Sequence, residues 1–232
     1  TLLDNQGRRI LWSWCMDERP AAVRAASGWS GVMSLPRVLS LDPGGLRIQP
    51  APELERLRWN PRELSDIALK SETPHPLDSI SGAGLELSLT IDMQTARRVG
   101  VRVRQTPDAT EESVIWIDRE AGQLAIDVSK STLDPRIHYR TWCITRPTEP
   151  DDANRRVTVQ EAPLEIPAGQ LVELRIFLDH SMLEVFANGR QCMTQRLWPT
   201  RPDATRVSLV CEGGDARVKS LRAWDMAASQ PD

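Results

Sequence analysis

From about residue 80 onward, hydrophobic and polar positions alternate along the chain with a period of two. The clearest stretch runs over residues 85–91, where Leu and Ile alternate with Glu86, Ser88 and Thr90. The pattern recurs in three further series: Val99, Val101 and Val103; Leu124, Ile126 and Val128; and Val172, Leu174, Ile176 and Leu178. Because successive side chains of a strand point to opposite faces, each stretch predicts a strand with one buried and one solvated face. Such strands predict antiparallel sheets packed face to face.

The dipeptide Asn188-Gly189 predicts a β-hairpin. It separates two strand-like runs, residues 182–186 and 191–194. Asn-Gly favours the positive φ angles that a type I′ turn requires. Residues 66–226 therefore offer enough strand-forming sequence for a β-sandwich of ten or more strands.

Signals for helices are sparse. Pro52 followed by Glu53 and Leu54 predicts a short helix over residues 52–57, with Pro near its first position and Glu in its first turn. Prolines and glycines cluster around this segment, at Pro43, Gly44, Gly45, Pro50 and Pro61. This composition is typical of a linker, so we expect a domain boundary near residues 50–65.

The opening of the chain predicts strands without evident partners. Trp12 and Trp14 are two apart in an apolar run, so on a strand they share one face. A second strand-like run follows over residues 32–41 after a polar connection. We expect these strands to be the last part of a larger sheet structure.

Composition narrows the function classes only slightly. The chain has 232 residues, 40% of them hydrophobic and 26% charged, with a net charge of -3. This balance gives no reason to expect nucleic acid or an anionic membrane as a partner. The sequence has no apolar run long enough to span a bilayer and no signal-peptide pattern. Cytoplasmic and secreted locations both stay open.

The four cysteines do not form a metal-binding pattern. Cys15, Cys143, Cys192 and Cys211 are widely spaced, without a C-x-x-C pair or a nearby histidine cluster. No metal or organic cofactor is therefore predicted. Cys143, Cys192 and Cys211 lie in strand-like runs, where we expect buried free thiols.

Two polar clusters resemble catalytic groups and are better explained structurally. Asp179-His180-Ser181 cannot form a triad on a strand, because His180 would point away from both neighbours. We expect a tight connection there instead. The acidic pair Asp17-Glu18 predicts a loop at the rim of a site, since neighbouring carboxylates on a strand diverge. Neither cluster receives a catalytic assignment.

Trp29 is the one candidate binding residue. It lies between Gly28 and Ser30, with Gly31 beyond, so its indole is free to be exposed and to stack on the C–H face of a sugar ring. The alternative is burial at a core or domain interface, which we expect for Trp116, Trp142 and Trp224 in their strand-like surroundings.

Three motifs in order resemble glycoside hydrolase family 32, the β-fructosidases, invertases and levanases. The opening RRILWSW and Gly28-Trp29-Ser30-Gly31 through Ser34-Leu35-Pro36-Arg37 resemble the end of that family's catalytic propeller. Residues 50–58 are similar to its P-x-P-E-L-x-x-L-R linker, and residues 175–190 to its FLD-x-S-x-x-EVF-x-NG block. The resemblance covers nearly the whole chain.

The resemblance implies a fold and a division into domains. It implies an all-β fold: an antiparallel β-sandwich, jelly-roll or concanavalin-like, preceded by remnant strands of the last blade of a five-bladed β-propeller. Residues 1–49 would be the propeller remnant, residues 50–65 a linker with a short helix, and residues 66–232 the C-terminal sandwich. Its partners would be the missing N-terminal propeller and a fructose-containing oligo- or polysaccharide, and a homodimer stays open.

The resemblance also implies an activity to which this chain contributes only a part. The family cleaves terminal β-fructosyl bonds with retention, and a tryptophan in its GW-x-G segment lines the fructose pocket, which would assign Trp29 to substrate binding. The family's three catalytic carboxylates lie in WMNDPNG, RDP and EC motifs, and none of these occurs in this sequence. Cys211-Glu212 has the reverse order of the EC motif, so Glu212 is not assigned the acid/base role. We therefore expect no catalytic residue here and no hydrolysis by the chain alone. The alternative is a stand-alone carbohydrate-binding or structural sandwich.

Overall fold

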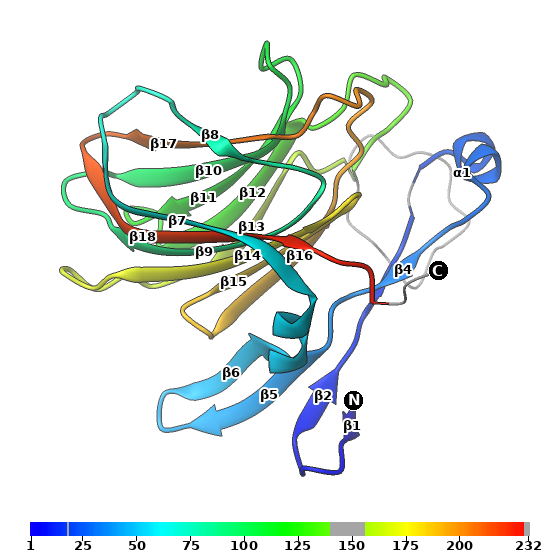
Figure 1. The fold of residues 1–232 in the computed structure, drawn as a ribbon, viewed down its shortest axis with the longest axis horizontal. Coiled ribbons are helices and arrows are strands. Elements are labelled where there is room, and N and C mark those ends of the chain that lie inside the picture. Colours follow the sequence, from blue (N-terminus) through cyan, green and yellow to red (C-terminus); the bar gives the residue numbers. More distant parts are fainter. Residues whose placement is uncertain (18, 140–155, 230–232) are drawn as a thin grey trace.

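The structure, a computed structural model, describes residues 1–17, 19–139 and 156–229. Within these residues the fold is all-β, with two six-stranded sheets that pack face to face and a smaller four-stranded sheet below them (Figure 1). Every strand pairing is antiparallel. The predicted antiparallel β-sandwich is confirmed.

One layer of the sandwich, here called the β11 sheet, has the strand order β13-β12-β11-β10-β17-β8. Its strands are β8 (His75–Ser81), β10 (Arg98–Gln105), β11 (Glu112–Asp118), β12 (Gln123–Lys130), β13 (Val159–Pro163) and β17 (Arg206–Glu212). The alternating series of Val99 and of Leu124 lie on β10 and β12, as predicted.

The other layer, the β14 sheet, has the order β16-β15-β14-β9-β18-β7. Its strands are β7 (Arg58–Leu69), β9 (Gly84–Asp92), β14 (Val172–Asp179), β15 (Met182–Ala187), β16 (Gln191–Arg196) and β18 (Ala216–Met226). The predicted hairpin joins β15 to β16, and both Asn188 and Gly189 have positive φ, 53° and 62°. Three residues, 188–190, lie between the paired Ala187 and Gln191.

The core fills the space between the two sheets. It includes the inward-facing members of the alternating series, among them Leu87, Val101, Ile126 and Ile176, each at most 1% exposed. Burial of such side chains contributes roughly 1.5–3 kcal/mol each. The hydrophobic pattern therefore predicts this core directly.

One polar position departs from the predicted alternation. Glu86, expected on the solvated face of β9, is fully buried. The guanidinium groups of Arg58 and Arg175 cover its carboxylate, with contacts of 2.7 and 2.6 Å. The outer face of the β14 sheet is therefore not solvated here, because cationic side chains from β7 and β14 close over it.

The tryptophans expected at interfaces differ in their surroundings. Trp116 is buried, but on the outer face of the β11 sheet, in a small cluster with Val114, Ala125 and Val210. Trp224 is half-buried, with the Arg58 guanidinium 4.1 Å from its ring centre. Trp142 lies outside the described residues.

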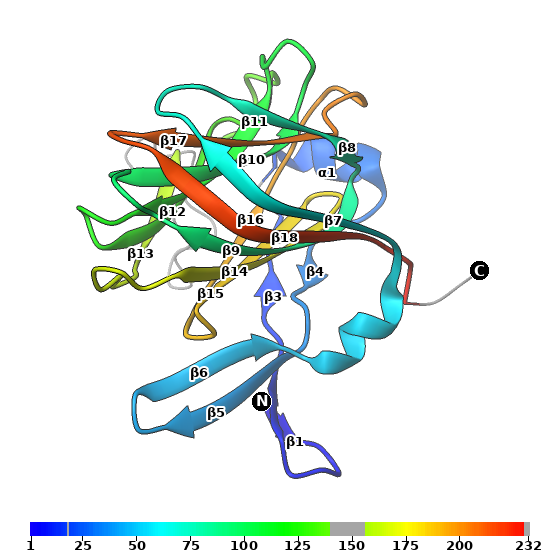
Figure 2. The ribbon, with the colours of Figure 1, turned by 60° about the vertical axis from the view of Figure 1, so that its left-hand side comes forward.

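The N-terminal part forms the smaller sheet, in the order β1-β2-β5-β6 (Figure 2). Its strands are β1 (Leu2–Leu3), β2 (Arg9–Leu11), β5 (Arg37–Asp42) and β6 (Gly45–Pro50). β3 (Trp14–Cys15) and β4 (Val32–Met33) form a separate two-stranded pair, and helix α1 (Ala21–Ser27) lies between them in the sequence. The predicted short helix is the 3-10 helix η1 (Pro52–Leu57), and β7 begins directly after it.

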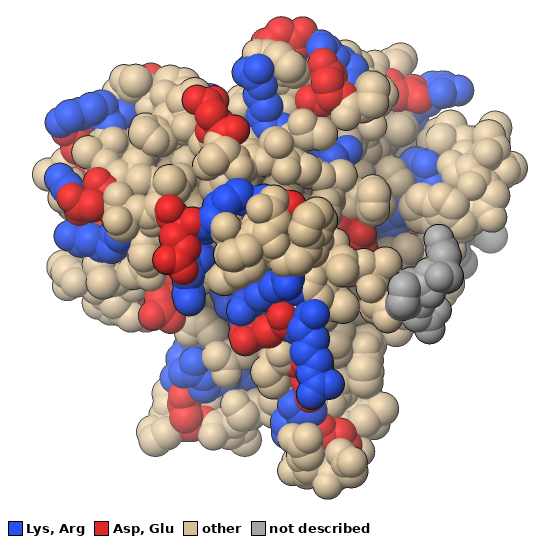
Figure 3. Space-filling view, in the orientation of Figure 1, with Lys and Arg blue, Asp and Glu red and all other residues tan. Residues whose placement is uncertain are grey.

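Charged side chains are interspersed on the face seen in Figure 3, where acidic and basic groups lie side by side. Ion pairs among the described residues include Arg62 with Asp225 at 2.7 Å and Arg8 with Glu53 at 2.6 Å. In the described part of the chain, no helix is long and apolar enough to cross a membrane.

Candidate functional site

The candidate residue Trp29 follows α1 and lies against the sandwich. Gly28 ends the helix in the left-handed conformation, with φ of 74°, and places Trp29 beside Trp198, which follows β16. The two ring centres are 6.2 Å apart and the planes are inclined by 35°. Trp29 nevertheless keeps 44% of its surface exposed.

Two arginines complete this group, which we call the Trp29 cluster: Arg19, Trp29, Arg196 and Trp198. The Arg19 guanidinium lies 5.0 Å from the Trp29 ring centre and 4.0 Å from that of Trp198. The corresponding distances for Arg196 are 5.3 and 4.4 Å. Cations at these distances are attracted to indole faces. The sandwich thus contributes two of the residues that hold Trp29 in place.

Asp17 anchors the cluster. Its carboxylate is buried and accepts hydrogen bonds from Arg19, with Nη2 at 2.6 Å and Nε at 3.0 Å. Burial opposes ionisation, but the Arg19 hydrogen bonds outweigh it and hold the pKa of Asp17 below its ordinary value. The predicted loop position of Asp17 is confirmed, and Glu18 lies outside the described residues. Asp17 positions Arg19 here.

A buried ion pair joins the N-terminal sheet to the sandwich. Arg37, at the start of β5, donates from Nη2 to the Oε2 atom of Glu184 on β15 at 2.6 Å. The Leu35 amide donates to the other carboxylate oxygen, also at 2.6 Å, and Arg37 contacts Thr194 on β16. Arg37 and Glu184 are only 8% and 2% exposed. Burial raises the pKa of Glu184 despite these bonds.

Apolar side chains surround this ion pair. Phe177 and Phe186 point out of the β14 sheet and pack edge to face, with ring centres 5.9 Å apart. Leu54 of η1 completes a buried cluster with them, and Leu35 and Ile48 pack against it from the N-terminal side. Together with Arg37 and Glu184, these residues form what we call the joint.

The β15–β16 turn extends the joint to the far end of the N-terminal sheet. The Ile48 amide donates to the Gly189 carbonyl at 3.0 Å, and Arg190 pairs with Asp42 at 2.6 Å. A Cβ atom on Gly189 would lie 2.6 Å from the Arg47 guanidinium. Gly189 is therefore favoured by its positive φ, whereas the flexible end of the Arg47 side chain could move away from a Cβ atom.

A cavity of about 1100 Å³ lies beside the joint. The N-terminal segment lines it with Trp14 and Cys15, and the sandwich with Thr194, Gln195 and Trp198. Trp29 is not among its lining residues. The Arg196 and Trp198 side chains therefore separate this cavity from the exposed indole of Trp29.

The remaining sequence candidates have structural roles. Asp179 pairs with Met182, so His180 and Ser181 form the predicted tight connection, with His180 at a φ of 51°. The Ser181 hydroxyl accepts a hydrogen bond from Arg196 at 2.8 Å.

The described cysteines are all free thiols. Cys211 is buried as predicted, whereas the predicted burial of Cys192 is wrong, because its side chain is half-buried. Cys15 is also half-buried, and Cys143 lies outside the described residues. Burial raises the pKa of Cys192 to about 12, so this thiol is protonated at neutral pH. Among the residues that the structure describes, no group of three or more His, Cys, Asp or Glu side chains could hold a metal ion.

Sequence reasoning missed the partners that make this site. Arg37 and Glu184 each interrupt an apolar run, and each lies within a quoted motif. Two opposite charges in apolar surroundings are a signal for a buried pair, because an unpaired buried charge is costly. Arg196 and Trp198 lie in no quoted motif.

The structure thus defines an all-β protein in which a β-sandwich carries a docked four-stranded sheet. The sequence model described as "Glycosyl hydrolases family 32 C terminal" matches residues 53–225. The chain belongs to glycosyl hydrolase family 32.

Named relatives agree with this assignment. The chain is 29% identical over 220 residues to a sucrose-6-phosphate hydrolase from Staphylococcus xylosus, covering 94% of this chain and 40% of that protein. It is 29% identical over 227 residues to a raffinose invertase from Escherichia coli, covering 97% and 41%. The chain therefore spans well under half the length of these relatives.

The solved structure of fructan 1-exohydrolase IIa from Cichorium intybus has a similar fold. The TM-score is 0.83 at 22% sequence identity, covering 98% of this chain and 47% of that one. At this level of identity the similarity supports the fold alone. It includes the N-terminal sheet as well as the sandwich, since nearly the whole chain is aligned.

Proposed function

We propose that this chain is the C-terminal portion of a retaining glycoside hydrolase that acts on terminal β-fructosyl bonds in sucrose, levan or inulin type substrates. Family membership and the names of the relatives support the reaction class. The chain would supply the stabilising sandwich and one edge of the sugar pocket. Its nucleophile, transition-state stabiliser and acid/base would come from propeller residues outside these 232, because the three catalytic motifs do not occur here.

The division into domains is part of this proposal. Residues 1–49 would belong to the catalytic propeller, 50–65 to the linker and 66–232 to the sandwich. The linker would then contain η1 and the first residues of β7. Exposed side chains of residues 1–49, such as Trp12, Trp14, Met33 and Leu41, would pack against the preceding propeller blade.

Trp29 carries the proposal for substrate binding. Its indole is held against Trp198 by two guanidinium groups, yet 44% of its surface is accessible. An immobilised and partly exposed indole is suited to stacking on a sugar ring, because little conformational entropy is lost when the ligand binds. We assign Trp29 to the edge of the fructose pocket.

The test uses the natural protein that contains this chain, with sucrose, levan and inulin as substrates. Trp29→Ala should raise KM by about tenfold, the loss expected for one aromatic stacking contact. Trp59→Ala is the matched control, because Trp59 is also exposed, at 57%, but lies on β7. Equal KM values for both variants would remove Trp29 from the site.

The isolated chain provides a second test. The purified 232-residue protein should show no sucrose hydrolysis. Measurable turnover, with contaminating invertase excluded, would contradict the proposal that the catalytic carboxylates lie elsewhere. If the natural protein also lacks turnover on all three substrates, a binding or structural module becomes the correct interpretation.

A further inference from the structure

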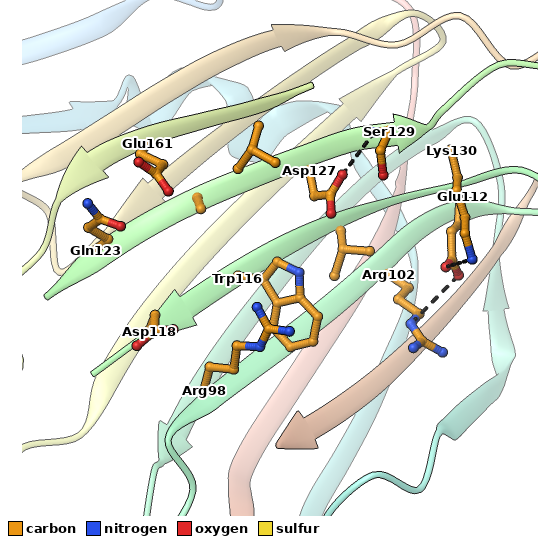
Figure 4. Close-up of a pocket in the computed structure, with 13 residues that line it drawn as sticks. Arg98, Arg102, Glu112, Trp116, Asp118, Gln123, Asp127, Ser129, Lys130 and Glu161 are labelled. Atoms are coloured by element: carbon orange, nitrogen blue, oxygen red, sulfur yellow. Dashed lines mark hydrogen bonds and ion pairs between the residues drawn. The ribbon is translucent and has the colours of Figure 1, made fainter. Parts of the chain in front are cut away.

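The outer face of the β11 sheet carries a hollow that the proposed hydrolase function does not use. The strand register aligns Gly100, Trp116, Ala125 and Glu161 in one row across β10, β11, β12 and β13. Because Ala125 is small and stands between two larger residues, it leaves a depression in this row. The groove around it has a volume of about 380 Å³ (Figure 4), within the range of small-molecule sites.

Trp116 forms a fixed wall of this hollow. The Arg98 guanidinium lies 4.1 Å from its ring centre and is itself paired with Glu212 at 2.6 Å. On the sheet side, a Cβ atom on Gly100 would lie 2.8 Å from the indole. The glycine therefore allows the ring to lie close to the sheet. The Trp116 ring, Val114 and Val159 give the hollow an apolar lining.

The polar groups around Ala125 retain unused hydrogen-bonding capacity. Gln123 and Asp127 flank Ala125 on the same face of β12, and Glu161 opposes it on β13. Within the described part of the chain, the side chains of Gln123 and Glu161 have no hydrogen-bond or ion-pair partner. Asp127 accepts one hydrogen bond, from the Ser129 amide at 2.8 Å.

The other end of the same groove is different. There the Glu112 carboxylate forms ion pairs with Arg102 at 3.6 Å and Lys130 at 3.7 Å. It also accepts a hydrogen bond from the Gln105 amide at 2.8 Å. Two cations thus face this one carboxylate, and Glu112 is only 8% exposed. Among the described groove residues, the carboxylate and amide groups without a charged partner therefore lie around Ala125, whereas at this end the Nε atom of Arg102 lacks a hydrogen-bond partner.

We propose that the hollow around Ala125, with Trp116 as its wall and Gln123, Asp127 and Glu161 as its polar rim, binds a neutral saccharide. The two carboxylates would accept hydrogen bonds from sugar hydroxyls, and the Gln123 amide can donate and accept. The C–H groups of a pyranose or furanose ring would contact Val159, which is 39% exposed, and the small part of the indole that the Arg98 guanidinium leaves exposed. An anionic ligand is disfavoured, because Asp127 and Glu161 would repel it.

The experiment titrates the intact 232-residue chain with 1-kestose and with sucrose, followed by amide chemical shifts in the NMR spectrum. We expect shifts centred on β12 and β13, with a Kd on the order of millimolar. Glu161→Gln should weaken binding about tenfold, since it removes a charged hydrogen-bond acceptor. Ala125→Leu should abolish binding by filling the hollow, while its neighbours Leu124 and Ile126 keep the core unchanged.

Glu173→Gln on β14 is the matched control, because Glu173 is an exposed strand residue of the other sheet. It should leave the affinity unchanged. The proposal is overturned if neither sugar shifts the amide signals of β12 and β13, or if Glu161→Gln binds sugar as tightly as the control does. A parallel titration uses choline, a cation that the two carboxylates would attract. Binding of choline without binding of either sugar would also overturn the proposal. Such a failure would leave the proposed hydrolase function standing, since that function is measured by turnover and by Trp29→Ala.

Discussion

The N-terminal sheet and the sandwich differ in how they bury hydrophobic side chains. The sandwich encloses a continuous core, in which Leu85, Ile115 and Leu124 have no exposed surface. Among the described residues before Pro50, Ile10 is the one buried hydrophobic side chain. The other buried residues there are polar: Asp17, Ser34 and Arg37.

This comparison shows where the stability of the N-terminal sheet comes from. Eight large hydrophobic side chains of the N-terminal segment that carries this sheet are exposed, namely Leu2, Leu3, Trp12, Trp14, Trp29, Met33, Leu41 and Leu46. A four-stranded sheet without a core of its own is not expected to be stable alone. The sheet is therefore held by the joint, through Arg37–Glu184 and the Phe186 cluster.

Deletion of residues 1–48 should have the largest effect. From sequence, removal of strands with unpaired edges is expected to improve solubility. The contacts in the structure argue for the opposite result, because deletion would expose Phe177 and Phe186 and remove the Arg37 partner of Glu184. We now predict a lower melting temperature and lower solubility for residues 49–232. A truncated protein that melts at or above the temperature of the intact chain would show that the joint contributes nothing.

Arg37→Ala should give the next largest effect. It leaves the Glu184 carboxylate buried and unpaired, which costs about 3–5 kcal/mol in the free energy of unfolding of the joint. Urea unfolding followed by tryptophan fluorescence would measure the change. Arg9→Ala is the control, because Arg9 is exposed and, among the described residues, its side chain bonds to Thr1 at the chain start. The double variant Arg37→Met/Glu184→Leu should recover most of the loss, since it removes both charges.

A smaller effect is expected in the pH dependence of stability, where two buried glutamates, Glu111 in the sandwich and Glu184 in the joint, should act in opposite directions. Burial of Glu111 opposes ionisation, but hydrogen bonds from Thr200, Arg201 and Leu133 outweigh it, so its pKa is lowered from 4.5. Its contribution to stability is present above pH 4.5 and is lost as pH falls through the folded pKa. Burial raises the pKa of Glu184 above 4.5, so its contribution is present below that pH and is lost as pH rises.

Urea midpoints of the wild type, Glu111→Gln and Glu184→Gln between about pH 3 and 8 would separate these contributions. On acidification, the wild type should gain stability relative to Glu184→Gln. It should lose stability relative to Glu111→Gln once the pH falls below 4.5. If both differences change in the same direction, the contrast between the two glutamates is wrong.

The sequence predicted the parts of the molecule that follow from local patterns. The core strands follow from the period-two alternation, and the hairpin follows from Asn188-Gly189. Glu86 was misassigned to solvent because its partners, Arg58 and Arg175, come from other strands. The Arg37–Glu184 pair joins residues 147 positions apart, and Trp29 meets Trp198 across an even longer separation. Such contacts depend on the tertiary arrangement, which no local pattern specifies.

Amide hydrogen exchange of the intact chain and of Arg37→Ala tests the central claim most directly. If the joint holds the N-terminal sheet, Arg37→Ala should accelerate exchange at amides of β2 and β5, such as Ile10 and Leu39, and at the Ile48 amide of β6 that donates to Gly189. Protection on β9, β10, β12 and β14 should stay unchanged, because the sandwich has its own core. Unchanged protection in the N-terminal sheet of the variant would contradict the account.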